Sequence, residues 1–375
     1  MQSENSPRRT DVPKTRADAV PFSSNALRLS PRQWIIALAL IALLFWLIPI
    51  VWRWAEPFEP GPDARIPYSL SDDYWLYHRY CRRAAAEDAT LVIGDSVIWG
   101  HFVAKEETLS HYLSELGGGR FVNLGVDGTH PAAMAGLMEY YGGDVRGKNV
   151  LLHCNLLWMS SKKADLQTDK EFALQHAKLV PQFFPRIPCY TEPLWGRLCI
   201  VVERNVPFFG WMGHLRAAYF EKKDFYTWTV EHPYDDPLRP PPPEELPSPP
   251  PTAESWTQRR IEKSSPSWVE LETSFQWSCF RRTVQTLQAR GNRVFVVVGP
   301  FNEHMLKPEG LRKYRDRKAG VAAWLAENGI PHFVPPPLPS ECYADASHPL
   351  REGYALLAKQ LLETEAFRRF QQGAD

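Results

Sequence analysis

Residues 89–96 read ATLVIGDS and continue into VIWG, and this short stretch decides the fold class. An apolar run that stops at Gly94 is typical of a buried strand ending in a turn. The same rhythm of apolar run, turn and amphipathic stretch returns along the chain. Strands are therefore expected at residues 89–96, 120–125, 149–155, 293–300 and 331–335.

Amphipathic stretches alternate with these strands. Their spacing predicts helices at residues 106–116, 129–141, 269–291, 317–329 and 351–363. Strands separated by helices pair in parallel, because parallel neighbours need a long crossover connection. β-Branched runs such as VFVVV at 294–298 suit a sheet covered on both faces. The expected fold is an α/β three-layer sandwich around a five-stranded parallel sheet.

One segment near the N-terminus is apolar enough to span a membrane. Residues 33–52 lie between two arginines, and Gln33 is their only polar side chain. At helical rise this length covers about 30 Å, the thickness of a hydrocarbon core. A cleaved signal peptide would have a shorter apolar run and a cleavage site made of small residues. A buried core helix would be expected to come with other apolar segments that could pack around it. A single transmembrane helix at 33–52 is therefore expected.

Basic residues predict the orientation of this helix. Residues 1–32 carry six of them, whereas acidic residues interrupt the basic ones after residue 52. The positive-inside rule then makes 1–32 a disordered cytoplasmic tail. Residues 53–375 would form an extracytoplasmic domain, held at the cell membrane by one pass of the chain.

The composition argues against nucleic acid as a partner and against a bound metal ion. The chain has 43 Lys and Arg against 43 Asp and Glu, so no basic stripe for nucleic acid is expected. Its six cysteines have sparse spacing that fits no metal or redox motif. We expect no cofactor, and the sequence leaves the oligomeric state open.

A long interruption, at about residues 160–266, separates the two halves of the predicted sheet. Nine aromatic residues fall within 206–234, and nine prolines fall within 237–251. One interpretation is a mostly helical, Pro-rich insert whose aromatics pack a small core, with an exposed polyproline loop. The other is an element that lies on a membrane surface or covers the substrate.

Polar residues follow several predicted strands at the edge where open α/β sheets bind ligands. Ser96 follows the first strand, Gly128 the second and Asn155 the third, while Asp345 and His348 follow the fifth. A serine becomes a nucleophile only if a base takes its proton and donors stabilise the oxyanion. An aspartate three residues before a histidine can fix the imidazole tautomer. The order of these elements predicts such a site.

Four short blocks carry a family resemblance. GDSVIWG, NLGVDG, HCNLLW and DASHP resemble the blocks of the SGNH (GDSL-type) hydrolase family. The resemblance covers residues 88–158 and 270–365 and none of the insert. It implies a flavodoxin-like sheet, a triad and an oxyanion hole. The implied triad is Ser96, Asp345 and His348, and the implied oxyanion donors are Ser96, Gly128 and Asn155.

The third block departs from the family pattern. Members usually read GxND there, whereas this chain has His153, Cys154, Asn155 and Leu156. The missing aspartate raises the question of what holds Asn155. Histidines and polar residues near the predicted strand ends are either structural or possible substrate contacts. These candidates are His130, His153, Asn302 and His304.

The resemblance implies a serine-dependent ester hydrolase, an acyl esterase or deacetylase, that forms an acyl-enzyme on Ser96. The substrate would be a small-molecule or glycan ester. Two alternatives remain open. The chain could transfer the acyl group to an envelope polysaccharide as an O-acyltransferase, or it could be a non-catalytic envelope binding or assembly protein that retains the fold.

Overall fold

The computed structural model describes residues 29–244 and 254–373, and the chain divides into a unit up to Trp54 and a unit from Ala55. The first unit contains one long helix, α1 (Pro31–Ala55). Its mean hydropathy reaches 2.8, so by length and composition it could cross a membrane. The helix expected at 33–52 is present and slightly longer. The predicted tail lies almost entirely outside the described residues.

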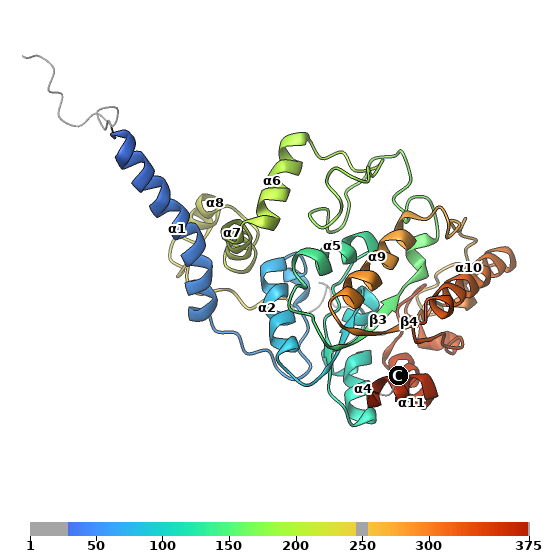
Figure 1. Cartoon of the computed structure of the whole chain (residues 1–375). Helices are drawn as coiled ribbons and strands as arrows, with labels where there is room; N and C mark the ends of the chain where they lie inside the picture. Colours follow the sequence, from blue (N-terminus) through green and yellow to red (C-terminus); the bar gives the residue numbers. More distant parts are fainter. Residues whose placement is uncertain (1–28, 245–253, 374–375) are drawn as a thin grey trace, which may run out of the picture. The chain divides into compact units, whose positions relative to one another are not determined.

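The second unit is built around a five-stranded sheet (Figure 1). Its strands are β1 (Thr90–Ile93), β2 (Phe121–Asn123), β3 (Asn149–Cys154), β4 (Arg293–Val298) and β5 (His332–Phe333). They lie in the order β2-β1-β3-β4-β5, and every pair is parallel. The order reverses direction at β1, which sits between β2 and β3. This doubly wound arrangement confirms the expected flavodoxin-like sheet.

Helices cover both faces of the sheet, with β3 and β4 between them in Figure 1. One face packs against α2 (Tyr74–Ala85), α5 (Pro131–Tyr140), α9 (Phe275–Ala289) and α10 (Pro308–Glu327). The other packs against α4 (Leu109–Gly117), α11 (Arg351–Glu363) and α12 (Glu365–Gln372). In β4, Val296 faces the first layer and Phe295 faces the second. The alternation of strand side chains thus fills two apolar layers.

Some elements differ from the sequence-based expectation. Helices α2 and α12 were not predicted, although both are amphipathic: α12 is only eight residues long and follows α11 after Thr364 alone. Helix α10 begins earlier than expected, at Pro308, a residue that is favourable in the first helical turn. Helix α4 begins after Thr108, whose side chain caps it by accepting from the His111 backbone N–H.

Outside residues 245–253, which the structure does not describe, the interruption contains three helices, α6 (Leu194–Asn205), α7 (Pro207–Ala218) and α8 (Phe225–Glu231). The rest of its described residues are turns and irregular segments, so a mostly helical insert is found only between 194 and 231. Of the nine aromatic residues in 206–234, only Tyr219 and Trp228 are buried. Most of these aromatics are therefore not enclosed in a core, although Phe220 packs against Trp228 with ring centroids 5.4 Å apart. Part of the predicted polyproline stretch lies outside the described residues, and 237–244 is exposed and irregular.

Candidate active site

The turn after β1 presents Ser96 at the carboxyl edge of the sheet. Gly94 ends the strand, and a Cβ on it would lie 2.3 Å from the Ile98 side chain, so only glycine fits. Asp95 then starts the short helix α3 (Ser96–Trp99), and its Oδ1 accepts from the Val97 backbone N–H at 3.0 Å. This cap fixes the position of Ser96 directly behind the strand tip.

Three predicted residues form one chain of hydrogen bonds. Nε2 of His348 lies 2.8 Å from Oγ of Ser96. Nδ1 of the same imidazole lies 2.8 Å from both carboxylate oxygens of Asp345. Asp345 also accepts the backbone N–H groups of Ser347 and His348, each at 3.0 Å. With Nδ1 protonated toward the carboxylate, Nε2 is free to accept the serine proton.

The electrostatics of this pair suit a base oriented by a carboxylate. Burial would raise the pKa of Asp345, but the charge of His348 and the hydrogen bonds bring it down to about 2. Burial would lower the pKa of His348, yet the Asp345 charge and hydrogen bond outweigh burial and raise it. Asp345 therefore stays ionised and stabilises the imidazolium form of His348.

Asn155 follows β3 and is held in a fixed orientation. Its Oδ1 accepts from the Leu157 backbone N–H at 2.9 Å, and its Nδ2 donates to Oδ2 of Asp95 at 2.8 Å. Exchanging the two ends of the amide would place donor against donor and acceptor against acceptor. One Nδ2–H remains for another acceptor.

Asp95 answers the question raised by the departure in the third block. Besides Asn155, its carboxylate accepts the indole N–H of Trp158 at 2.9 Å and lies 3.1 Å from Nδ1 of His153. Burial would raise the pKa of Asp95, but the His153 imidazole and these hydrogen bonds hold it at about 2. The carboxylate of the first block thus holds the amide of the third.

Gly128 lies in a tight turn after β2. The Thr129 backbone N–H closes this turn by donating to the Val126 carbonyl at 3.3 Å. Gly128 has φ of +71°, a conformation that side chains disfavour. A Cβ there would also lie 2.9 Å from Oε1 of Gln175. The positive φ therefore favours glycine, and any side chain would also push the exposed Gln175 side chain aside.

The four residues predicted as possible substrate contacts form hydrogen bonds with other residues of the protein. His153 is buried beneath Asp95, and His130 is a buried cap of α5 whose Nδ1 accepts from the Ala133 N–H. Burial lowers the pKa of His130 to about 4. Asn302 is fully buried and donates to the Asp345 carbonyl at 3.1 Å, which supports the loop that carries the triad. His304 is exposed, with Nε2 3.0 Å from the Leu338 carbonyl.

Sequence reasoning missed a second histidine and aspartate beside the triad. Nδ1 of His101 lies 2.6 Å from Oδ1 of Asp127, and the His101 ring centroid lies 5.5 Å from that of His348. Phe102 packs edge-on against His348 at 5.4 Å. The available signal was position, since His101 directly follows the first block and Asp127 precedes Gly128.

Buried Arg65 holds the segment that carries these rings. Its guanidinium donates to the carbonyls of Trp99, Gly100 and Val103, and it lies 3.9 Å from the Trp99 ring centroid. Nothing in the sequence around Arg65 indicated this role. Its contacts fix the backbone between Ser96 and the second histidine.

A cavity of about 650 Å³ adjoins this region. Asp127 and Gln175 line it, and these side chains also contact His101 and flank Gly128. The opposite lining comes from Tyr68 and from residues 241–244 of the proline-rich segment. Within residues 29–244 and 254–373, no group of three His, Cys, Asp or Glu side chains is arranged to hold a metal ion.

Comparison with known proteins adds little to this geometry. No protein-family model matches the chain, and no curated protein matches it. One solved structure that resembles it is described as a "putative lipolytic protein of G-D-S-L family" from Desulfitobacterium hafniense DCB-2. That likeness covers 74% of this chain and 98% of the other, at 10% sequence identity and a TM-score of 0.36. Similarity at this level carries no argument about function, which therefore rests on the chain's own residues.

Proposed function

We propose that the protein is a serine-dependent ester hydrolase of the SGNH type, acting through an acyl-enzyme on Ser96. The observation that carries this proposal is the chain of 2.8 Å contacts from Ser96 through His348 to Asp345. These residues come from segments about 250 positions apart, and a structural role alone would not require them to meet at the ligand-binding edge of the sheet.

The proposed reaction has two steps. His348 takes the Ser96 hydroxyl proton as Oγ attacks the ester carbonyl. The resulting imidazolium then gives this proton to the departing alcohol. The carbonyl oxygen becomes an oxyanion, stabilised by the Ser96 and Gly128 backbone N–H groups and the free Nδ2–H of Asn155. Each such donor contributes about 3 kcal/mol. Water, deprotonated by His348, then attacks the acyl carbon. The bond from that carbon to Ser96 Oγ breaks, the imidazolium gives its proton to Oγ, and the acid leaves.

A second candidate is transfer of the acyl group to a sugar hydroxyl. The cavity beside Asp127 favours it, because its lining combines an aromatic ring, Tyr68, with hydroxyl, amide and carboxylate side chains. Such a lining suits a polyhydroxylated acceptor or substrate. We place this reaction, like hydrolysis, on the extracytoplasmic side of the membrane. A glycan or other envelope ester is the proposed substrate class.

An active-site probe tests the enzymatic proposal against the non-catalytic alternative. Full-length chain in detergent is incubated with a fluorophosphonate, and labelled peptides are identified by mass spectrometry. We expect labelling of Ser96, and loss of labelling in Ser96→Ala and His348→Ala. Leu116→Ala, on the surface of α4, is the matched control and should label like the wild type. A wild-type chain that stays unlabelled beside an active control esterase would favour a binding or assembly protein.

Product analysis separates hydrolysis from transfer. The full-length chain is supplied with an activated acetyl ester, with and without an acetyl-free oligosaccharide. Hydrolysis predicts free acetate in equal amount in both samples. Acyl transfer predicts that the oligosaccharide gains acetyl groups while free acetate falls, and that both products disappear in Ser96→Ala.

A further inference from the structure

Helices α6 and α8 expose most of their large apolar side chains. No residue of α6 is buried, although its sequence LWGRLCIVVERN is largely apolar. His214 is the only buried residue of α7, and Trp228 the only one of α8. Trp195 on α6 is 75% exposed and Phe225 on α8 is 59% exposed. Helices in water gain most of their stability from burying an apolar face, so the exposed apolar faces of α6 and α8 are unusual for a protein surrounded by water.

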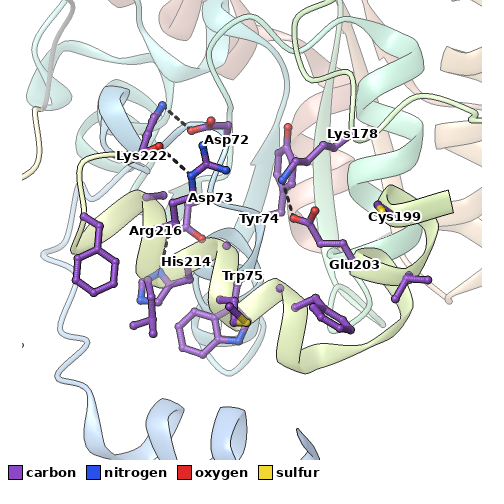
Figure 2. A pocket seen from close by; sticks show the side chains of 18 of the residues that line it. Asp72, Asp73, Tyr74, Trp75, Lys178, Cys199, Glu203, His214, Arg216 and Lys222 are labelled. Carbon is purple, nitrogen blue, oxygen red and sulfur yellow. Dashed lines mark hydrogen bonds and ion pairs between the residues drawn. The ribbon is translucent and has the colours of Figure 1, made fainter. Parts of the chain in front are cut away.

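The three helices surround a cavity of about 1150 Å³ together with the start of α2 (Figure 2). This volume slightly exceeds that of typical small-ligand pockets, about 300–1,000 Å³. Most of its lining is hydrocarbon, aromatic or sulfur-containing. The apolar lining includes Trp75, Trp195, Leu198, Val202, Phe209 and Met212.

Two lysines at the cavity are paired with carboxylates, and Arg216 donates from Nε to the Lys222 backbone carbonyl at 2.8 Å. Lys178 pairs with Glu203 at 2.7 Å, and Lys222 pairs with Asp72 at 2.8 Å. Figure 2 shows these two pairs on either side of Tyr74. Because these two lysines are neutralised within the protein, the apolar part of the lining suits a hydrocarbon occupant.

The covalent chain connects this region to the candidate membrane span. Helix α1 ends at Ala55, and the next residue, Glu56, is fixed within the second unit. Its carboxylate accepts from the Tyr219 hydroxyl at 2.8 Å, lies 2.8 Å from Nε2 of His214 on α7, and pairs with Arg79 on α2. The chain is thus bound to α7 and α2 from the first residue after α1.

We propose that α6 and α8 dock on the lipid bilayer that α1 spans, and that lipid acyl chains fill the apolar cavity. Exposed tryptophan and tyrosine side chains such as Trp195 and Tyr226 fit the boundary between headgroups and acyl chains, where such rings are enriched. Docking would cover the apolar faces that the protein itself leaves open. The proposal goes beyond ester hydrolysis, and it does not depend on the role of Ser96.

A photoactivatable lipid tests the docking directly. Full-length chain is placed in phosphatidylcholine nanodiscs that contain a phosphatidylcholine with a diazirine on one acyl chain. After irradiation we expect lipid adducts in α1 and in residues 194–231. Leu198→Asp and Phe225→Asp should lose most adducts in 194–231 and keep those in α1. Leu116→Asp, which alters a comparably exposed leucine on α4, is the matched control and should keep both. Adducts confined to α1 in the wild type would overturn the proposal.

Cys199 provides a second readout, because it is the exposed one of the six cysteines and it lines the cavity. A nitroxide attached there in nanodiscs should collide more often with oxygen than with a water-soluble nickel chelate, as in hydrocarbon. Preferential collision with the chelate would contradict lipid docking. Strong dipolar broadening between labels would also contradict it, since a second copy of the chain would then cover the face.

Discussion

Asn155 donates a 2.8 Å hydrogen bond to Asp95, the residue directly before the candidate nucleophile. The amide that would stabilise the oxyanion and the turn that presents Ser96 are thus linked through one buried carboxylate. Trp158 and His153 contact the same carboxylate, so the nucleophile turn and the segment after β3 form one polar network. This network holds Asn155 in place although no aspartate follows it in the sequence.

The link between Asp95 and Asn155 predicts non-additive effects on catalysis. Asn155→Ala should lower kcat about a hundredfold to a thousandfold, because one oxyanion donor is lost. Asp95→Asn should cause a loss of similar size, since the amide is no longer held by a charge. The double variant should be little worse than either single one. Trp158→Phe, which removes only one donor to Asp95, is the control and should have a smaller effect. Fully additive losses in steady-state kinetics would show that the two residues act separately.

The pair of Asp345 and His348 predicts the pH dependence of activity. His348 must be neutral to act as the base, and its pKa is raised in the folded protein. The acid limb of kcat/KM should therefore lie above about 6.5, the ordinary pKa of histidine. Asp345→Asn should shift this limb to lower pH and reduce kcat about ten-thousandfold. His304→Gln, which changes an exposed histidine, is the control and should leave the acid limb in place. An unchanged acid limb in Asp345→Asn would contradict the assignment of Asp345 as the partner of His348.

The turn at Gly128 predicts that any side chain there lowers both the stability and the activity of the protein. Gly128→Ala would place a residue with a Cβ in the left-handed conformation, at a cost of about 1–2 kcal/mol, and would also press on Gln175. We expect a lower melting temperature and a lower kcat. Adding Gln175→Ala should relieve the contact but not the backbone strain, so stability should recover only in part. Complete recovery, measured by thermal unfolding, would mean that the left-handed turn has no role.

Buried His214 predicts that the folded protein loses stability at alkaline pH. Burial would lower its pKa, but the charges of Asp73 and Glu56 and their hydrogen bonds raise it to about 9. A raised pKa stabilises the folded state fully below about 6.5, and this contribution is lost as the pH rises through about 9. The loss in the free energy of unfolding amounts to at most about 3–4 kcal/mol, at roughly 1.4 kcal/mol per pKa unit.

Thermal unfolding of the full-length chain at several pH values between about 6 and 10 measures this effect. The melting temperature of the wild type should fall across that range. His214→Gln should start lower and fall less, while His304→Gln should follow the wild type. Parallel curves for wild type and His214→Gln would exclude a charged His214 in the folded protein.

Local patterns predicted the sheet and the positions of the candidate residues. Each strand ends in a recognisable turn, so the sequence alone was enough to place Ser96, Gly128 and Asn155 at the correct edge. The contact between Asp95 and Asn155 could not be predicted, because it joins segments 60 positions apart whose spacing in sequence carries no signal. Arg65 escaped notice for the same reason.

The interruption shows a different limit of sequence reasoning. Clustered aromatics such as Phe225 and Trp228 are equally compatible with a small core and with an exposed apolar face, since composition does not reveal which side chains find partners. In the structure Trp228 is buried and Phe225 is not. Only the helix packing distinguishes these two outcomes, and it favours an exposed face over a core.

The central claim is that Ser96 carries the acyl group, and acyl-enzyme trapping measures it most directly. Full-length chain is mixed rapidly with p-nitrophenyl acetate, quenched in acid and analysed by peptide mass spectrometry. The account predicts a burst of p-nitrophenol with one acetyl group per chain on the Ser96 peptide, and neither burst nor adduct in Ser96→Ala. Turnover that persists in Ser96→Ala, or an acetyl group found on another residue, would contradict it.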